Sequence, residues 1–107
     1  MLAISRFRYD EDLTDQARTE LGVCLEHLAA RPGFASGTVG RALDDPAMWV
    51  LTTAWDNVGA YRRALSSYEI KMYVVPLLAR AIDEPSAYEV IIGEGATTPN
   101  AVRPRGQ

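Results

Sequence analysis

The sequence predicts an α+β domain in which helices cover one face of a four-stranded antiparallel sheet. Three observations support this fold class. An alternating N-terminal segment leads into a helical repeat, two apolar runs flank a turn, and a β-branched run follows further helical segments. This order of strand, helix, hairpin, helices and strand is that of the ferredoxin-like split βαβ plan.

Composition narrows the class of protein. The chain has 107 residues, which suits a single domain with a real core. With a net charge of -3, the protein has no excess of basic residues to displace counterions from nucleic acid, so electrostatics does not favour its binding. No apolar run approaches the ~20 residues of a membrane helix, and residues 1–6 do not form a signal peptide. We therefore expect a cytoplasmic protein with no nucleic-acid or membrane partner.

The first strand and the first helix have clear periods. Residues 2–9 alternate as a strand does, and the acidic residues 10–12 suit a helix N-terminus. A helix is expected from about Leu13 to the stop sequence at residues 31–33. Its apolar stripe recurs at spacings of three and four and contains Leu13, Ala17, Leu21, Cys24, Leu25 and Leu28.

A hairpin is expected next. Residues 34–43 have the composition of a strand, although Gly37 and Gly40 lower its propensity and indicate a bulge. Residues 44–46, Asp-Asp-Pro, form a turn sequence, and residues 48–55 resume as a strand.

Two helical stretches follow the hairpin. Asp56 or Asn57 caps the first of them. Ser66 and Glu69 have the spacing of a capping box for the second, which Pro76 interrupts.

The C-terminal part is expected to contain the last strand and a tail. Residues 87–93 are rich in β-branched residues and are expected to form the fourth strand. Residues 94–107 have almost nothing to bury, so we expect one domain over residues 1–93 and a disordered tail over 94–107.

Both faces of the predicted sheet need burial. The third strand places Trp49, Leu51 and Trp55 on one side and Met48, Val50 and Ala54 on the other. Because the helices of one chain cover only one face, we expect a homodimer in which two sheets stack into a barrel-like core. Arg6 and Arg8 would then point between the sheets, where Glu89 could pair with one of them.

Residues 55–61, Trp-Asp-Asn-Val-Gly-Ala-Tyr, and residues 66–71, together with the element order, resemble the antibiotic biosynthesis monooxygenase superfamily of the dimeric α/β-barrel fold. The resemblance covers residues 2–93. It implies a cofactor-independent monooxygenase whose aromatic or quinol-type substrate, as its anion, reduces O2 in a desolvated pocket. It therefore implies no cofactor.

The superfamily pattern matches at Trp55 and Tyr61, whereas Leu51 stands where a hydrogen-bonding Asn would be. In the heme-degrading branch, the functional Asn, Trp and His correspond to Ser5, Ala64 and Val74. Iron therefore has no ligand at that position, and we do not expect heme degradation. A heme binder without degrading activity is a further alternative.

The resemblance and the predicted faces together give a candidate site. Tyr61 is the predicted catalytic hydrogen-bonding group. His27, the only imidazole, lies at the border of the apolar stripe and is a candidate general base. The predicted substrate pocket consists of Ser5, Phe7, Leu51, Trp55, Tyr61 and Tyr73.

Each candidate also has a structural interpretation. A buried indole or phenol ring packs a core well without touching substrate, and a boundary histidine is usually a surface group. We expect Cys24 to be a buried, unreactive small hydrophobe, and neither the lone cysteine nor the lone histidine forms a metal site. The alternative function is a non-catalytic, small-molecule-binding or accessory dimer of the same fold, which Leu51 favours.

Overall fold

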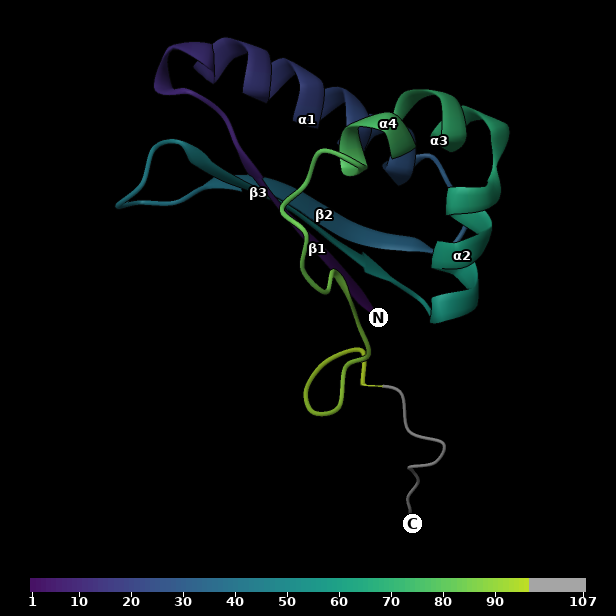
Figure 1. Cartoon of the computed structure of the whole chain (residues 1–107). Coiled ribbons are helices and arrows are strands. Elements are labelled where there is room, and N and C mark those ends of the chain that lie inside the picture. Colours follow the sequence, from purple (N-terminus) through teal and green to yellow (C-terminus); the bar gives the residue numbers. More distant parts are fainter. Residues whose placement is uncertain (97–107) are drawn as a thin grey trace.

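A computed structural model describes residues 1–96 and confirms the ferredoxin-like α+β fold (Figure 1). The predicted tail lies, from residue 97 onward, outside the described residues. The elements are, in chain order, β1 (Leu2–Arg8), the 3₁₀ helix η1 (Glu11–Leu13), α1 (Thr14–Ala29), β2 (Phe34–Arg41), β3 (Met48–Trp55), α2 (Val58–Ser66), α3 (Tyr68–Tyr73), α4 (Val75–Leu78) and β4 (Ala87–Tyr88).

The strand order is β2-β3-β1-β4, and every neighbouring pair is antiparallel. β1 pairs with β3 along its whole length, from Leu2 opposite Ala54 to Arg8 opposite Met48. The register of the β2–β3 hairpin shifts between Phe34 and Ser36, which confirms the predicted bulge. The two central strands therefore carry most of the sheet, with β2 and β4 at its edges.

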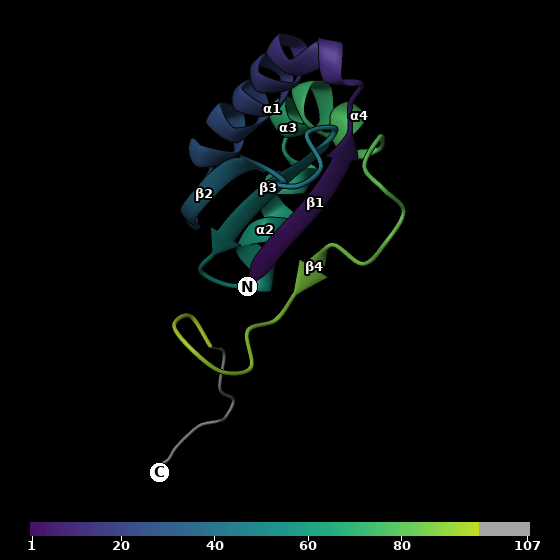
Figure 2. The same cartoon turned by 90° about the vertical axis from the view of Figure 1, so that its left-hand side faces the viewer.

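Helices α1, α3 and α4 lie over one face of the sheet, and α2 lies at the end where β3 leaves it (Figures 1 and 2). The α1 stripe is buried as its period predicts, because Ala17, Leu21, Cys24 and Leu28 all face the core. Pro76 lies in the first turn of α4, where its missing N–H is tolerated, so the last helical stretch breaks into α3 and α4.

The alternation of β3 sorts its residues between a covered face and an open face. Trp49, Leu51, Thr53 and Trp55 are buried under the helices, whereas Met48, Val50, Thr52 and Ala54 are half-buried on the other side. On β1, Ala3 and Phe7 face the helices. Apolar side chains therefore occur on both faces of the sheet, although the helices of the described chain cover only one.

Two local predictions differ from the structure. The fourth strand is limited to Ala87–Tyr88, because these residues pair with Ala3 and Leu2, and Leu2 is the first residue of β1. The predicted capping box does not form, because Ser67 rather than Ser66 is the N-cap of α3. The Ser66 hydroxyl instead donates to the carbonyl oxygen of Arg62 in the last turn of α2.

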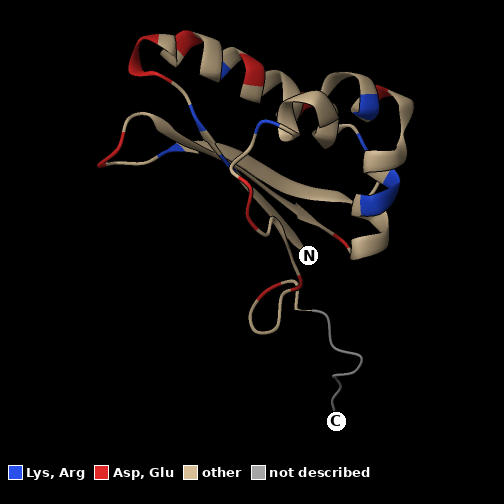
Figure 3. Cartoon of the chain, in the orientation of Figure 1, with Lys and Arg blue, Asp and Glu red and all other residues tan. Residues whose placement is uncertain are grey.

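Charged side chains are scarce on the strands and gather elsewhere (Figure 3). The predicted pairing of Glu89 with an arginine of β1 is wrong. Arg6 forms two hydrogen bonds of 2.7 Å with Glu84, and Arg8 contacts Asp45 in the β2–β3 turn at 3.3 Å. Both arginines therefore reach carboxylates in loops beyond the ends of neighbouring strands.

Candidate functional site

Three residues with hydroxyl groups line one inner cavity. Ser5 comes from β1, Thr53 from β3 and Tyr61 from α2, and all three line an inner cavity of about 10 Å³. This volume corresponds to about one water molecule. The other walls of the inner cavity are apolar and consist of Ala3, Leu28, Leu51 and Leu78.

A larger outer cavity of about 280 Å³ adjoins the inner one and shares Ser5, Tyr61 and Leu78 with it. The segment after α4 forms its rim, where Asp83 and Glu84 supply carboxylates. Ser5 and Tyr61 therefore lie where the apolar inner cavity meets the more polar outer one. The remaining lining residues are Ile4, Ala79, Ala81, Ile82 and Ser86.

The start of α2 positions Tyr61. Asn57 caps this helix, as predicted, and its side-chain oxygen accepts a hydrogen bond from the backbone N–H of Ala60 at 2.8 Å. The ring centroid of Tyr61 lies 5.6 Å from that of Trp55. Desolvation raises the pKa of the Tyr61 phenol, so the group stays neutral at physiological pH. Within residues 1–96 its hydroxyl has no hydrogen-bond partner, which leaves it free to donate into the cavities.

Trp55 contacts two residues of the site, Tyr61 and Thr53. It is buried against Phe34 in an edge-to-face contact with ring centroids 5.4 Å apart. Its indole N–H donates to the Thr53 hydroxyl oxygen at 2.8 Å, which orients that hydroxyl. Trp55 and Phe7, both predicted as pocket walls, line neither the inner nor the outer cavity.

Sequence reasoning missed Thr53. The signal was present, because the alternation of β3 places this threonine in the covered row with Trp49, Leu51 and Trp55. A polar side chain in an otherwise apolar row is buried only at a cost unless it has a hydrogen-bond partner.

The rim of the outer cavity carries an ion pair. Nε and Nη2 of Arg6 each donate a hydrogen bond to the Glu84 carboxylate, and these bonds hold the pKa of Glu84 below the ordinary range. Glu84 is therefore ionised near neutral pH, and the pair fixes the loop after α4 against β1.

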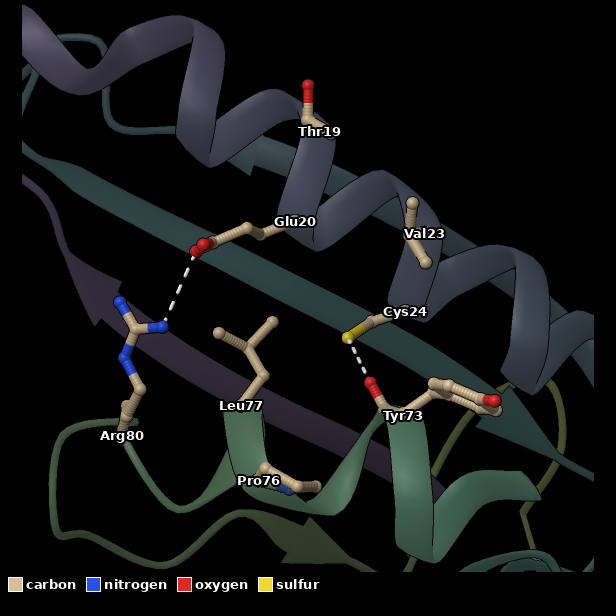
Figure 4. A pocket seen from close by; sticks show the side chains of 8 residues that line it. All are labelled: Thr19, Glu20, Val23, Cys24, Tyr73, Pro76, Leu77 and Arg80. Atoms are coloured by element: carbon tan, nitrogen blue, oxygen red, sulfur yellow. Dashed lines mark hydrogen bonds and ion pairs between the residues drawn. The ribbon is translucent and has the colours of Figure 1, made fainter.

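Tyr73 lies in a different place from the other predicted pocket residues. It borders a groove of about 400 Å³ between α1 and the α3–α4 segment, and its side chain is 57% exposed (Figure 4). Glu20 and Arg80 face each other across this groove at 3.5 Å. The other residues that line the groove are Thr19, Val23, Cys24, Pro76 and Leu77.

Cys24 is buried at the base of this groove, as predicted. Its thiol donates to the backbone carbonyl of Tyr73 at 3.7 Å. Burial raises the pKa of the thiol to about 11, so the nucleophilic thiolate is scarce at neutral pH.

His27 is on the same side of the helix layer. Its Nδ1 bonds to the Glu69 carboxylate of α3, and its ring stacks on Tyr73 with centroids 5.1 Å apart. His27 lines neither the inner nor the outer cavity. The structure therefore separates the candidate base from Tyr61.

Tyr61 also borders a third space, a groove of about 360 Å³ beside β4. We call it the β4 groove. It is lined by Met1, Val58, Tyr61, Arg62, Leu65, Ala87, Tyr88 and Glu89.

Within residues 1–96, no three histidine, cysteine or acidic side chains gather closely enough to hold a metal ion. No helix in this part of the chain is long and apolar enough to cross a membrane.

The profile of the family described as antibiotic biosynthesis monooxygenase matches residues 1–75. The chain belongs to the antibiotic biosynthesis monooxygenase family. In this family member, the position of the expected Asn is Leu51, which lines the inner cavity, and Val74, where the heme-degrading branch has its His, is fully buried.

Solved structures share the fold of this antibiotic biosynthesis monooxygenase family member. SnoaB, a cofactor-independent oxygenase from Streptomyces nogalater, is 21% identical over 84% of this chain and 94% of its own, with a TM-score of 0.64. A conserved protein from Methanosarcina mazei Go1 is 15% identical over 80% of this chain and 84% of its own, with a TM-score of 0.64. Rv0793 from Mycobacterium tuberculosis is 20% identical over 80% and 86%, with a TM-score of 0.61. Among curated proteins, none matches the chain.

Proposed function

We propose that this protein is a cofactor-independent monooxygenase that acts in the cytoplasm on an aromatic or quinol-type small molecule. The observation that carries the proposal is that Ser5, Thr53 and Tyr61, three residues with hydroxyl groups, line one otherwise apolar cavity beside a larger open one. The outer cavity, at about 280 Å³, is close to the lower end of the roughly 300 to 1,000 Å³ of small-molecule sites.

The proposed chemistry uses the neutral phenol of Tyr61 as a hydrogen-bond donor. A substrate phenol loses its proton near the rim carboxylates and turns its oxygen toward Tyr61 and Ser5. Donors held in an apolar site stabilise such an anion more than water-exposed donors do. The anion then reduces O2 by four electrons. One oxygen atom replaces hydrogen as a hydroxyl at a ring CH, the quinol is oxidised to the quinone, and the second oxygen atom leaves as water with the two protons lost from the quinol hydroxyls.

The open face of the sheet supports a homodimer. Leu2, Ile4, Met48 and Val50 share this face, which no helix of the described chain covers. A second copy that stacks its own open face on the first buries both apolar surfaces in one self-complementary interface.

Oxygen uptake with a panel of dihydroxyaromatic compounds tests the proposal. The wild-type protein should consume O2 faster than the spontaneous reaction, and Tyr61→Phe should lower kcat roughly 10²-fold, as loss of one oxyanion-type donor does. Tyr68→Phe is the matched control, because Tyr68 is exposed on α3 and lines neither the inner nor the outer cavity. Wild-type uptake no faster than the spontaneous rate across the panel would reject the oxygenase.

The second candidate is a non-catalytic binding or accessory protein, and the aliphatic Leu51 in the inner cavity favours it. In that case the same compounds bind, as measured by quenching of tryptophan fluorescence, but show no turnover. Tyr61→Phe then weakens binding and leaves oxygen uptake at the spontaneous rate.

A further inference from the structure

We propose that the groove between α1 and the α3–α4 segment is a second binding site, which takes a small aromatic carboxylate. The proposed reaction does not use this groove, because its lining shares no residue with the inner or the outer cavity. α4 and the turn after it separate the two sides, since Leu77 and Arg80 line the groove whereas Leu78 and Ala79 line the outer cavity. A ligand in the groove is therefore distinct from a substrate in the outer cavity.

The groove has the size and the apolar lining of a small-molecule site. Its volume of about 400 Å³ lies within the roughly 300 to 1,000 Å³ typical of such sites. Val23, Pro76 and Leu77 supply apolar walls from α1 and α4. Because the Val23 side chain is exposed, a ligand that lies here covers apolar surface that is otherwise in contact with water.

An aromatic side chain forms one end of the groove (Figure 4). Tyr73 is exposed, yet its ring is held in place, because it stacks on the His27 imidazole with an angle of 9° between the two planes. The imidazole is itself fixed by the bond from its Nδ1 to the Glu69 carboxylate of α3. A ring whose orientation is set before a ligand arrives loses little conformational freedom on binding. This end therefore favours a planar aromatic group that packs against the exposed part of the Tyr73 ring.

Arg80 supplies a positive charge at the opposite end of the groove (Figure 4). Its Nη1 lies 3.5 Å from the Glu20 carboxylate, which is a long contact for a charged pair, and the Arg80 side chain is 56% exposed. Glu20 has closer donors, because the Tyr9 hydroxyl donates to it at 2.8 Å and the Gln16 amide at 3.2 Å. Within residues 1–96 no other carboxylate pairs with Arg80. Most of its guanidinium N–H groups are therefore available to an incoming anion.

The two ends define the chemical class of the ligand. A guanidinium binds a carboxylate through two parallel hydrogen bonds of about 2.8 Å, which are stronger than the present contact between Arg80 and Glu20. On α1, position 20 lies near this charge and position 27 beside the aromatic end, so the ends are about 10 Å apart at a rise of about 1.5 Å per residue. A carboxylate on a fused pair of aromatic rings, such as 2-naphthoate, has about this length. The negative charge of Glu20 opposes the ligand, so we expect modest affinity.

Titration of the full-length chain with 2-naphthoate tests the site, followed by calorimetry and by the backbone amide signals in NMR spectra. The signals of Val23, Tyr73 and Arg80 should shift with a single Kd below about 1 mM. The neutral 2-naphthamide has nearly the same shape without the charge and should bind the wild-type protein at least about tenfold more weakly. Arg80→Gln should raise the Kd of 2-naphthoate by a similar factor of about ten. Arg63→Gln is the matched control, because Arg63 is exposed on α2 and does not line the groove.

A second pair of variants tests the aromatic end. Tyr73→Ala should weaken binding roughly threefold to tenfold, whereas Tyr68→Ala, at an exposed tyrosine of the same helix that does not line the groove, should leave it unchanged.

Three outcomes would overturn the inference. Amide shifts confined to Ser5, Tyr61 and their neighbours would place the compound in the outer cavity instead. Equal affinity for the acid and the amide would remove the role of Arg80, and an absence of shifts at millimolar concentration would remove the site. The comparison of acid and amide uses the wild-type protein, so it decides the question even where a variant fails to fold.

Discussion

The Thr53 hydroxyl links the core to the cavity. Thr53 is the only buried polar residue in residues 1–96, and its oxygen accepts the indole N–H of Trp55. Because the hydroxyl donates no hydrogen bond within the described part of the chain, its proton is available to the inner cavity. One side chain thus satisfies a buried donor and supplies another donor to the candidate site.

Thr53→Val removes the acceptor of a buried N–H while preserving side-chain shape. The free energy of unfolding should fall by about 1 to 3 kcal/mol, the usual cost of a buried donor left without a partner. Urea denaturation followed by tryptophan fluorescence measures it. Thr52→Val on the open face is the control and should change stability by less than about 0.5 kcal/mol. Equal effects of the two substitutions would contradict the assigned role of Thr53.

Two buried groups, Tyr9 and Cys24, should lower the stability of the protein at alkaline pH. Burial, assisted by the hydrogen bond to Glu20, raises the pKa of Tyr9 from 10.0 to about 12, and burial raises that of Cys24 from 9.0 to about 11. The folded protein therefore holds these protons more tightly than the unfolded chain, so their contribution is complete below pH 9 and is lost as the pH rises to 12. The urea concentration at the midpoint of unfolding should therefore fall as the pH rises from 9 to 12.

Variants assign that pH dependence to its sources. Cys24→Ala should flatten the decline between pH 9 and 11, and Tyr9→Phe should flatten it between pH 10 and 12. A slope identical to that of the wild type in both variants would show that other groups control alkaline unfolding.

At the scale of residues, the sequence predicts whether a side chain is buried or caps a helix better than it predicts which cavity the side chain lines. It correctly indicated that Cys24 is buried and that Asn57 could cap a helix, because periodicity and capping are local properties. It grouped Tyr73 with Tyr61 because both belong to amphipathic helical stretches. Only the path of the chain through Pro76 and α4 determines that Tyr73 borders another groove.

Gly33, in the turn between α1 and β2, contacts the start of α2, although these segments are far apart in the sequence. It has a φ of +87° in the turn between α1 and β2, and its carbonyl accepts the backbone N–H of Asp56 at 2.8 Å. A Cβ at this position would clash with the Cβ of Ala60. The turn therefore requires glycine both for its backbone conformation and for the approach of α2.

Gly33→Ala should destabilise the protein by roughly 2 to 4 kcal/mol, since backbone strain and overpacking add at this position. Gly22→Ala is the matched control, because Gly22 is within α1 and a Cβ there meets no atom within 4 Å. That substitution should be neutral or stabilising by up to about 1 kcal/mol. Thermal unfolding compares the two variants, and a smaller loss at position 33 than at 22 would refute this account.

At the scale of elements, periodicity predicted the helix α1 and the three long strands. The glycines of β2 indicated a bulge, which the structure places just before them, between Phe34 and Ser36. It failed at the last strand, because a β-branched composition shows that residues 87–93 can pair but not that a neighbour exists. The ladder ends where β1 begins, and this register is a tertiary property.

At the scale of the whole molecule, the helices of residues 1–96 lie on only one side of the sheet (Figure 1). Apolar side chains on the open side include Ile4 and Val50, and the latter packs across the position of Gly40 on β2. Antiparallel sheets tolerate one solvated face when that face is polar. Here it is substantially apolar, which is why we expect two copies to associate through it.

Val50→Asp should convert the proposed dimer into a monomer, because it places a carboxylate at the centre of a desolvated interface. Sedimentation velocity at micromolar concentration measures the outcome. Val23→Asp is the control, since Val23 is a valine exposed on α1 and should leave association unchanged. Wild-type protein that sediments as a monomer would remove the basis for the stacked sheets.

Tyr61 borders the inner cavity, the outer cavity and the β4 groove, so all three spaces share this one aromatic ring. Two residues of the β4 groove, Ala87 and Tyr88, form the edge strand of the sheet whose open face is proposed to pack on the second copy. Dissociation of the subunits would then relax one wall behind that ring. Turnover per chain would decline on dilution, and the amount of protein in the cell would itself set how active each molecule is.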